Sequence, residues 1–244
     1  VGPLQVIESS EPITGQNIIA YIRRAWAPAD GNLTGAWWLR RKSFMGPLAE
    51  AALSRVETGA FDKIALAQTL LRLIEGKHFQ IFVNQPAVAA ILREHGWDGA
   101  LRRTAGDYRM VVDANVGYNK VNARVHQSVT YQVDLRASPP RAQVTLVYTN
   151  TSNVNYPCRP ETRYDPIYEQ MMDRCYWDYV RVYVPASTQL EDATRIPILA
   201  SALWNNIVDP GRVLARVADE GEFMSFEVPM VLPTASSQTR SYAL

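Results

Sequence analysis

The spacing of apolar residues changes once along this chain, and that change limits which folds the chain can adopt. Up to about residue 105 apolar residues recur mainly at helical spacing, whereas from residue 106 they alternate with polar residues as they do in strands. The alternation is clearest in RVHQSVTYQVDLR at 124–136, which is typical of a half-buried antiparallel strand. The sequence therefore predicts an α+β fold, with a helix-rich portion at 1–105 and a mainly antiparallel, β-rich, sandwich-like portion at 106–244, packed together as one rigid body.

The first portion carries four helix signals and one short strand signal. The best helix is KIALAQTLLRLIE, because Asp62 precedes it as a potential N-cap and Gly76 follows it in the place where a left-handed residue often ends a helix. Its apolar residues form one stripe, so we expect it to pack on another element. Shorter helices are expected from about Thr14 and from Gly46. The segment FQIFVN at 79–84 alternates like a strand before a helix at Pro86, which predicts a short βα element.

The second portion reads as a series of short strands separated by turns. Strands are expected at 108–116, 124–136, 142–150 and 176–185, and two to four more between 211 and 244. Pro229 and Pro233 are expected at edges or turns, because proline cannot donate to a strand ladder. This spacing favours a sandwich.

The two cysteines, Cys158 and Cys175, bracket a polar, proline-rich stretch. Two readings are open: two separate buried thiols, or a disulfide that would stabilise the fold by roughly 3 kcal/mol and indicate an oxidising compartment. Because little else would hold this stretch, we expect the disulfide.

Composition and motifs exclude several functional classes. The 25 basic and 24 acidic side chains leave a net charge of +1, so we expect no nucleic-acid partner. The histidines are far apart and form no HxH or HExxH pattern, so we expect no metal site. The chain also lacks a GxSxG elbow, a glycine-rich phosphate loop and a CxxC pair, and we expect neither a cofactor nor assigned catalytic residues.

The segment DANVGYNK, between two predicted strands, is the first candidate site. One reading is a connection in which asparagine side chains bond to their own backbone, with Gly117 giving the turn its freedom. The other is a ligand-binding loop in which Asp113, Asn115, Asn119 and Lys120 converge on a hydroxylated or anionic ligand.

The strand expected at 176–185 is the second candidate. Its valines share one face, and the other face carries aromatic and arginine side chains that could stack on sugars or anchor a protein partner: Trp177, Tyr179, Arg181 and Tyr183. Alternatively, this second face packs beneath the N-terminal helices.

Short segments spread over most of the chain resemble the bacterial family catalogued as domain of unknown function 4012. They are GKHF at 76–79, HGWDG at 95–99, DYRMVVDANVGYNKVNARV at 107–125 and DYVRVYVPAST at 178–188. The resemblance implies an envelope protein whose full-length form has an N-terminal transmembrane helix and holds this portion outside the membrane, in a cell-surface or exopolysaccharide context. It assigns no catalytic residue, because the activity of that family is unassigned.

No stretch approaches the roughly 20 apolar residues that span a bilayer, and the opening VGPLQVIESSEP is unlike a signal peptide. We expect a fragment of a longer surface protein, tethered only through a segment outside it. The expected function is non-enzymatic binding or scaffolding toward glycans or another envelope protein. The alternative is an envelope enzyme that acts on polysaccharide or on a lipid-linked glycan.

Overall fold

The computed structural model describes residues 2–7, 9–27, 35–59, 61–102, 106–165, 167–218 and 222–244. The chain divides into two compact units, Val1–Arg102 and Arg103–Leu244. The boundary expected between residues 105 and 106 adjoins residues 103–105, which lie outside the described ranges.

The first unit is helical, and its buried side chains include two aromatic pairs. Tyr21 packs edge-to-face on Phe44, and Trp26 on Trp37, each with ring centroids 6.1 Å apart. The Trp37 indole also donates to the Trp26 carbonyl at 3.0 Å. Its described helices are α1 (Ile18–Trp26), α2 (Gly35–Arg40), α3 (Met45–Glu57), α4 (Lys63–Glu75) and α5 (Pro86–Glu94).

The start of α4 is confirmed, but its predicted end and packing are not. The Asp62 carboxylate accepts from the backbone N–H groups of Ile64 and Ala65 at 3.0 Å, as an N-cap does. Gly76 has φ −73°, and the left-handed residue is Lys77 at φ 60°. A side chain at Gly76 would instead crowd the Arg72 carbonyl and the His78 ring. No residue of α4 is buried.

The strand predicted at 79–84 is wrong, although the helix after it, α5, is present. Residues 79–83 join no ladder in the described part of the chain, and Ile81 N–H bonds to the Trp97 carbonyl at 3.0 Å. Alternation alone does not make a strand, because a strand also needs a neighbour for its backbone groups.

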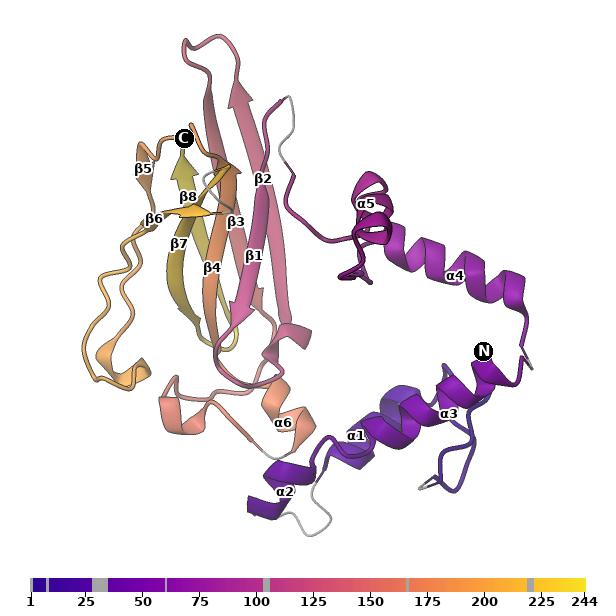
Figure 1. The fold of residues 1–244 in the computed structure, drawn as a ribbon. Helices are drawn as coiled ribbons and strands as arrows, with labels where there is room; N and C mark the ends of the chain where they lie inside the picture. The colour runs from indigo at the N-terminus through magenta and orange to yellow at the C-terminus, as the bar shows by residue number, and fades with distance from the viewer. Residues whose placement is uncertain are drawn as a thin grey trace. The chain divides into compact units, whose positions relative to one another are not determined.

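The second unit is a sandwich of two antiparallel four-stranded sheets, as predicted (Figure 1). One sheet has the strand order β1-β4-β7-β6, and the other β2-β3-β8-β5. The strands are β1 (Met110–Asn115), β2 (Val125–Asp134), β3 (Arg141–Asn150), β4 (Tyr176–Pro185), β5 (Asp192–Ala193), β6 (Leu214–Ala218), β7 (Phe223–Leu232) and β8 (Ser236–Ala243). Between them lie α6 (Tyr168–Met172) and the short 3-10 helices η1 (Val121–Ala123), η2 (Pro160–Thr162) and η3 (Ala200–Ala202).

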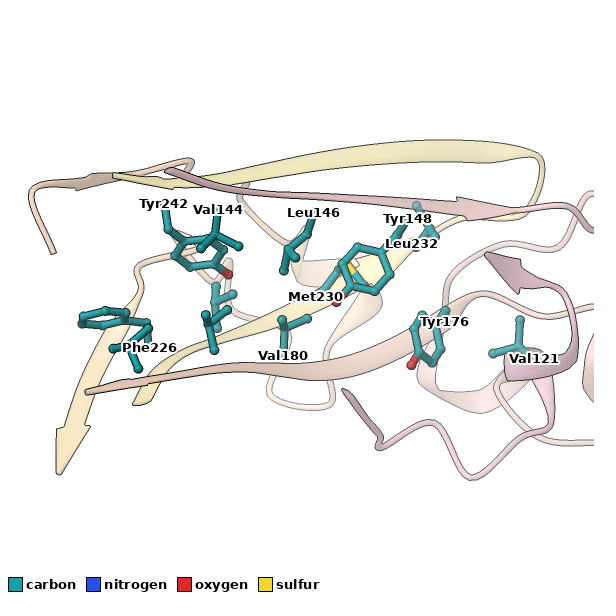
Figure 2. Packing of buried hydrophobic residues seen from close by; sticks show 13 residues of the cluster. Val121, Val144, Leu146, Tyr148, Tyr176, Val180, Phe226, Met230, Leu232 and Tyr242 are labelled. Atoms are coloured by element: carbon teal, nitrogen blue, oxygen red, sulfur yellow. The ribbon is translucent and has the colours of Figure 1, made fainter. Parts of the chain in front are cut away.

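The core lies between the two sheets. Figure 2 shows Val144, Leu146 and Tyr242 of one sheet pointing toward Phe226 and Val180 of the other. The valines of β4 at positions 180, 182 and 184 are at most 2% exposed, so their predicted common face is the buried one. Pro233 lies in the β7–β8 turn, as predicted. Pro229 lies instead within β7, opposite Tyr179 of β4, and is tolerated there because it lies beyond Phe223–Glu227, the stretch of β7 that pairs with β6.

Candidate functional site

The loop after β1 is held by its own asparagine side chains. The Asn115 carboxamide donates to the side-chain oxygens of Asn119 and Asn122, at 3.0 and 2.6 Å, and its oxygen accepts from Gly117 N–H at 2.9 Å. Asn119, which is 6% exposed, donates to the Cys175 carbonyl at 3.1 Å. The structure therefore brings Asn115 and Asn119 together, but toward each other and toward the start of β4. This geometry favours the reading of the segment as an Asx-rich connection.

The other two candidates of this segment point elsewhere. Lys120 is exposed, and its backbone N–H bonds to the Met171 carbonyl of α6 at 3.1 Å. Asp113 lies on β1, the edge strand, where its oxygens face the opposite sheet and accept from Tyr148 Oη at 2.7 Å and from Gln127 Nε2 at 2.9 Å. The four residues do not converge on one point open to a ligand.

Asp113 instead borders a group of buried polar side chains in the sandwich core, Tyr148, Asp178 and Arg240, which we call the polar layer. Sequence reasoning missed its most unusual member, Asp178. Asp178 is 1% exposed, and its carboxyl oxygens have no hydrogen-bond partner among the described residues. It precedes the β4 valines at the same parity, so it shares their buried face. The sequence does contain this signal, because Asp178 lies two positions before Val180, and side chains two positions apart in a strand point to the same face.

Burial controls the protonation of this layer. Loss of water around Asp178, reinforced by the charge of Asp113, raises the pKa of Asp178 to about 7. Burial likewise raises the pKa of Asp113, although the Tyr148 hydroxyl opposes the shift, and burial raises the pKa of Tyr148. Burial lowers the pKa of Arg240, which is 1% exposed on β8. The layer can hold a proton near neutral pH, but its acid lies inside the core, away from any substrate.

The aromatic and arginine face predicted on β4 is more enclosed than an open binding surface. Trp177 is 7% exposed, and its indole donates to the Ala202 carbonyl of η3 at 2.9 Å. Tyr179 donates to Glu227 Oε2 at 2.8 Å, and burial, followed by this contact, raises the pKa of Tyr179. Arg181 and Tyr183 are half-buried.

Glu227 of β7 organises the polar part of this face. Besides Tyr179, it accepts from the Ser225 hydroxyl at 2.8 Å and binds Arg216 of β6 at 3.0 Å. Glu227 is 8% exposed, and three donors compensate for its burial. These contacts tie β4, β6 and β7 together and leave Glu227 little capacity for a ligand.

A disulfide and several polar contacts hold the loops at the end of the sandwich where β4 begins. Cys158 and Cys175 form the predicted disulfide. Inside the segment that it closes, Arg174, 4% exposed, binds Asp165 at 2.7 Å and lies 3.6 Å over the Tyr156 ring. Figure 1 shows α6 and this segment gathered at one end of the strands.

Two exposed aromatic rings contact an arginine at this same end of the sandwich. The Arg163 guanidinium lies 4.7 Å from the Trp204 ring centroid and 5.7 Å from that of Tyr118. The two rings are nonetheless open to solvent, since Trp204 is 68% exposed and Tyr118 is 74% exposed. We call Tyr118, Arg163 and Trp204 the aromatic cluster. Its members come from three separate loops, and the loop of Trp204 also exposes Leu199, Ile207 and Val208.

The backbone under the cluster is specialised. Tyr118 has φ 56°, a left-handed conformation that is uncommon for a bulky residue and costs roughly 1–3 kcal/mol. The loop thus holds the Tyr118 ring outward at an energetic cost. Sequence reasoning missed the cluster, although the NN and DPG turn signals after Trp204 mark an exposed loop.

A cleft of about 490 Å³ lies among the β2–β3 hairpin, the segment after β4 and the chain's last described residue. Leu135, Pro140 and Leu244 form part of its apolar lining. Its charged groups are engaged with neighbours: Asp107 accepts from the Tyr131 hydroxyl, and Glu191 lies 3.6 Å from Arg141.

The described residues hold no metal-binding cluster and no membrane-spanning helix, and the chain has no detectable relative. No cluster of three or more His, Cys, Asp or Glu residues suited to a metal occurs in the described part of the chain. Across the same residues, no helix is both long and apolar enough to cross a bilayer. No family model matches the chain, and no curated protein or solved structure is detectably similar to it, so the family resemblance stays a prediction.

Proposed function

We propose that this chain is a non-enzymatic, extracytoplasmic binding module of a bacterial surface protein, and that its aromatic cluster binds glycans. The observation that carries the proposal is the exposure of the Tyr118 and Trp204 rings, whose centroids lie 5.7 and 4.7 Å from the Arg163 guanidinium at the end of the sandwich where β4 begins.

The chemistry of the cluster suits a saccharide. Sugar rings present C–H groups on their faces and hydroxyl groups at their edges, so an exposed aromatic ring can cover the face of a sugar while a cation or amide bonds its edge. Arg163 supplies several N–H donors, of which one nitrogen bonds to the Pro160 carbonyl at 3.0 Å. Because the disulfide segment and η3 fasten the surrounding loops, little order has to be gained on binding.

The disulfide supports the compartment in the proposal, because disulfides persist mainly in oxidising surroundings. Tethering by a transmembrane helix rests only on the family resemblance. Another envelope protein remains the second partner class, since exposed Trp and Tyr side chains also anchor protein interfaces.

The test is a titration of the protein with bacterial exopolysaccharides and peptidoglycan fragments, followed by calorimetry and tryptophan fluorescence. We expect Trp204→Ala to weaken binding at least tenfold. Phe82→Ala removes a ring that is 85% exposed in the first unit and serves as the matched control with unchanged affinity. Equal affinities for the two variants would overturn the proposed site.

Tyr118→Gly separates a binding role from a structural one. Glycine adopts a positive φ without strain, so this variant should keep or gain stability while losing glycan affinity. A loss of stability together with unchanged affinity would assign Tyr118 to the fold alone.

The alternative is an envelope enzyme acting on polysaccharide or lipid-linked glycan, and the cleft with Asp107 and Glu191 is the observation in its favour. We rank it second because both carboxylates already bind neighbouring side chains. Release of reducing ends from a polysaccharide, abolished by Glu191→Gln, would reverse this ranking.

A further inference from the structure

The strand β2 has an edge that is open for pairing. It ends the β2-β3-β8-β5 sheet and pairs with β3 alone among the described strands, over ten residues from Val125 to Asp134. Edge strands expose unpaired N–H and C=O groups, and proteins usually protect such edges with charged residues, proline or short length.

The other three sheet ends carry such protection. β5 has only two residues, β6 carries Arg216, and β1 has six residues with the inward-facing charge of Asp113. By contrast, β2 contains no lysine, arginine or proline, and its inward-facing residues are uncharged. Apart from Asp134 at its end, β2 therefore lacks the usual devices against pairing.

The hydrogen bonds between β2 and β3 determine which backbone N–H and C=O groups of β2 face the open edge. Thr151 N–H bonds to the Arg124 carbonyl at 2.8 Å, so Arg124 and every second residue after it face β3. The residues between them turn their N–H and C=O groups to the open edge: Val125, Gln127, Val129, Tyr131 and Val133.

We propose that two copies of this chain dimerise by pairing their β2 strands antiparallel about a two-fold axis at Thr130, which joins two four-stranded sheets into one continuous sheet. In this register the edge-facing residues bond in pairs, Val129 with Tyr131 and Gln127 with Val133.

Polar side chains opposite one another favour this register. With the axis at Thr130, His126 of each copy lies opposite Asp134 of the other, and Ser128 lies opposite Gln132. An axis at Val129 would keep the bonding parity but would place Asp134 opposite Arg124, and both of these residues already have an ion-pair partner, Arg136 at 3.0 Å and Asp173 at 3.3 Å. With the axis at Thr130, Asp134 keeps Arg136 and gains the imidazole N–H of His126 as a further donor. The two aromatic clusters of the dimer lie at opposite ends of the joined sheet.

Light scattering on the intact chain, coupled to gel filtration, tests the proposal. The wild type should have twice the 27.4 kDa mass of one chain. Thr130→Lys puts two like charges against each other on the axis and should give a monomer, whereas Gln143→Lys adds the same charge to β3, one strand inward, and should leave the dimer intact. A monomeric wild type at the highest soluble concentration would overturn the proposal.

A disulfide cross-link gives a second test, which does not depend on the correct folding of Thr130→Lys. A residue on the axis faces its own copy across a pair that lacks mutual hydrogen bonds, at a separation that a disulfide can span. Thr130→Cys should give a reductant-sensitive dimer under mild oxidation, and Gln143→Cys, at a position that is also exposed, should not. Cross-linking of both variants to the same extent, or of neither, would contradict the Thr130 axis.

Discussion

Replacing Asp178 with asparagine should change how the stability of the sandwich depends on pH. The pKa of Asp178 is about 7 in the folded chain, against an ordinary value of 3.8 that applies after unfolding. The folded state therefore holds the proton more tightly, so its stability falls as pH rises from about 4 to about 7. A difference of about 3 pKa units corresponds to a loss of about 4 kcal/mol, since each unit is worth 1.36 kcal/mol.

Asparagine has nearly the same shape but no charge to bury, so Asp178→Asn should lack this slope. We expect the variant to match the wild type near pH 4 and to exceed its free energy of unfolding by up to about 4 kcal/mol above pH 7. Urea unfolding followed by circular dichroism at a series of pH values measures both curves.

Two further variants make the measurement specific. Asp134→Asn changes an exposed aspartate whose pKa is lowered by Arg136, so it should not reproduce the effect. Asp113→Asn removes the second cause of the Asp178 shift but leaves its burial, so it should reduce the slope without abolishing it. If Asp178→Asn and the wild type lose stability in parallel between pH 4 and pH 7, the reasoning from burial is refuted.

Two other predictions concern covalent and backbone features. Replacing Cys158 and Cys175 together with alanine should lower the free energy of unfolding by about 3 kcal/mol in urea titrations, because the closed segment spans 17 positions of sequence; an unchanged midpoint would show that other contacts hold it. Gly211→Ala should cost about 2 kcal/mol or more, because Gly211 has φ 67° and an added Cβ would collide with the Ile196 carbonyl; thermal unfolding equal to that of the wild type would contradict this clash.

The strands of the second unit were predictable because alternation is a local property. The ranges expected at 124–136 and 176–185 contain β2 and β4, and the range 142–150 covers all of β3 except its first residue. The buried valine face of β4 follows from its period of two. The disulfide was predictable for a similar reason, since only two cysteines are available and both bracket one polar segment.

The candidate residues were predictable only in part. The sequence placed asparagines in one loop, but it could not say that Asn115 and Asn119 bond each other and the Cys175 carbonyl. Likewise, the sequence predicted Trp177 on a surface face, whereas in the structure η3 covers it. Tyr118 and Trp204 form a cluster because two separate loops bring them to Arg163, and the sequence does not show that contact.

The sequence by itself determined which residues share a face and where the helical period gives way to the strand period. Tertiary structure decided which strands become neighbours, which edge stays open and which polar groups are buried. Residues 79–83 alternate but form no strand, because no other segment in the described part of the chain pairs with them. The same kind of pattern in β2 pairs with β3 on one side, and no described strand pairs with its other side. The physical reason is that the local backbone geometry alone decides which side chains of a segment share a face. Hydrogen-bond pairing and burial depend instead on segments that come together from distant parts of the chain.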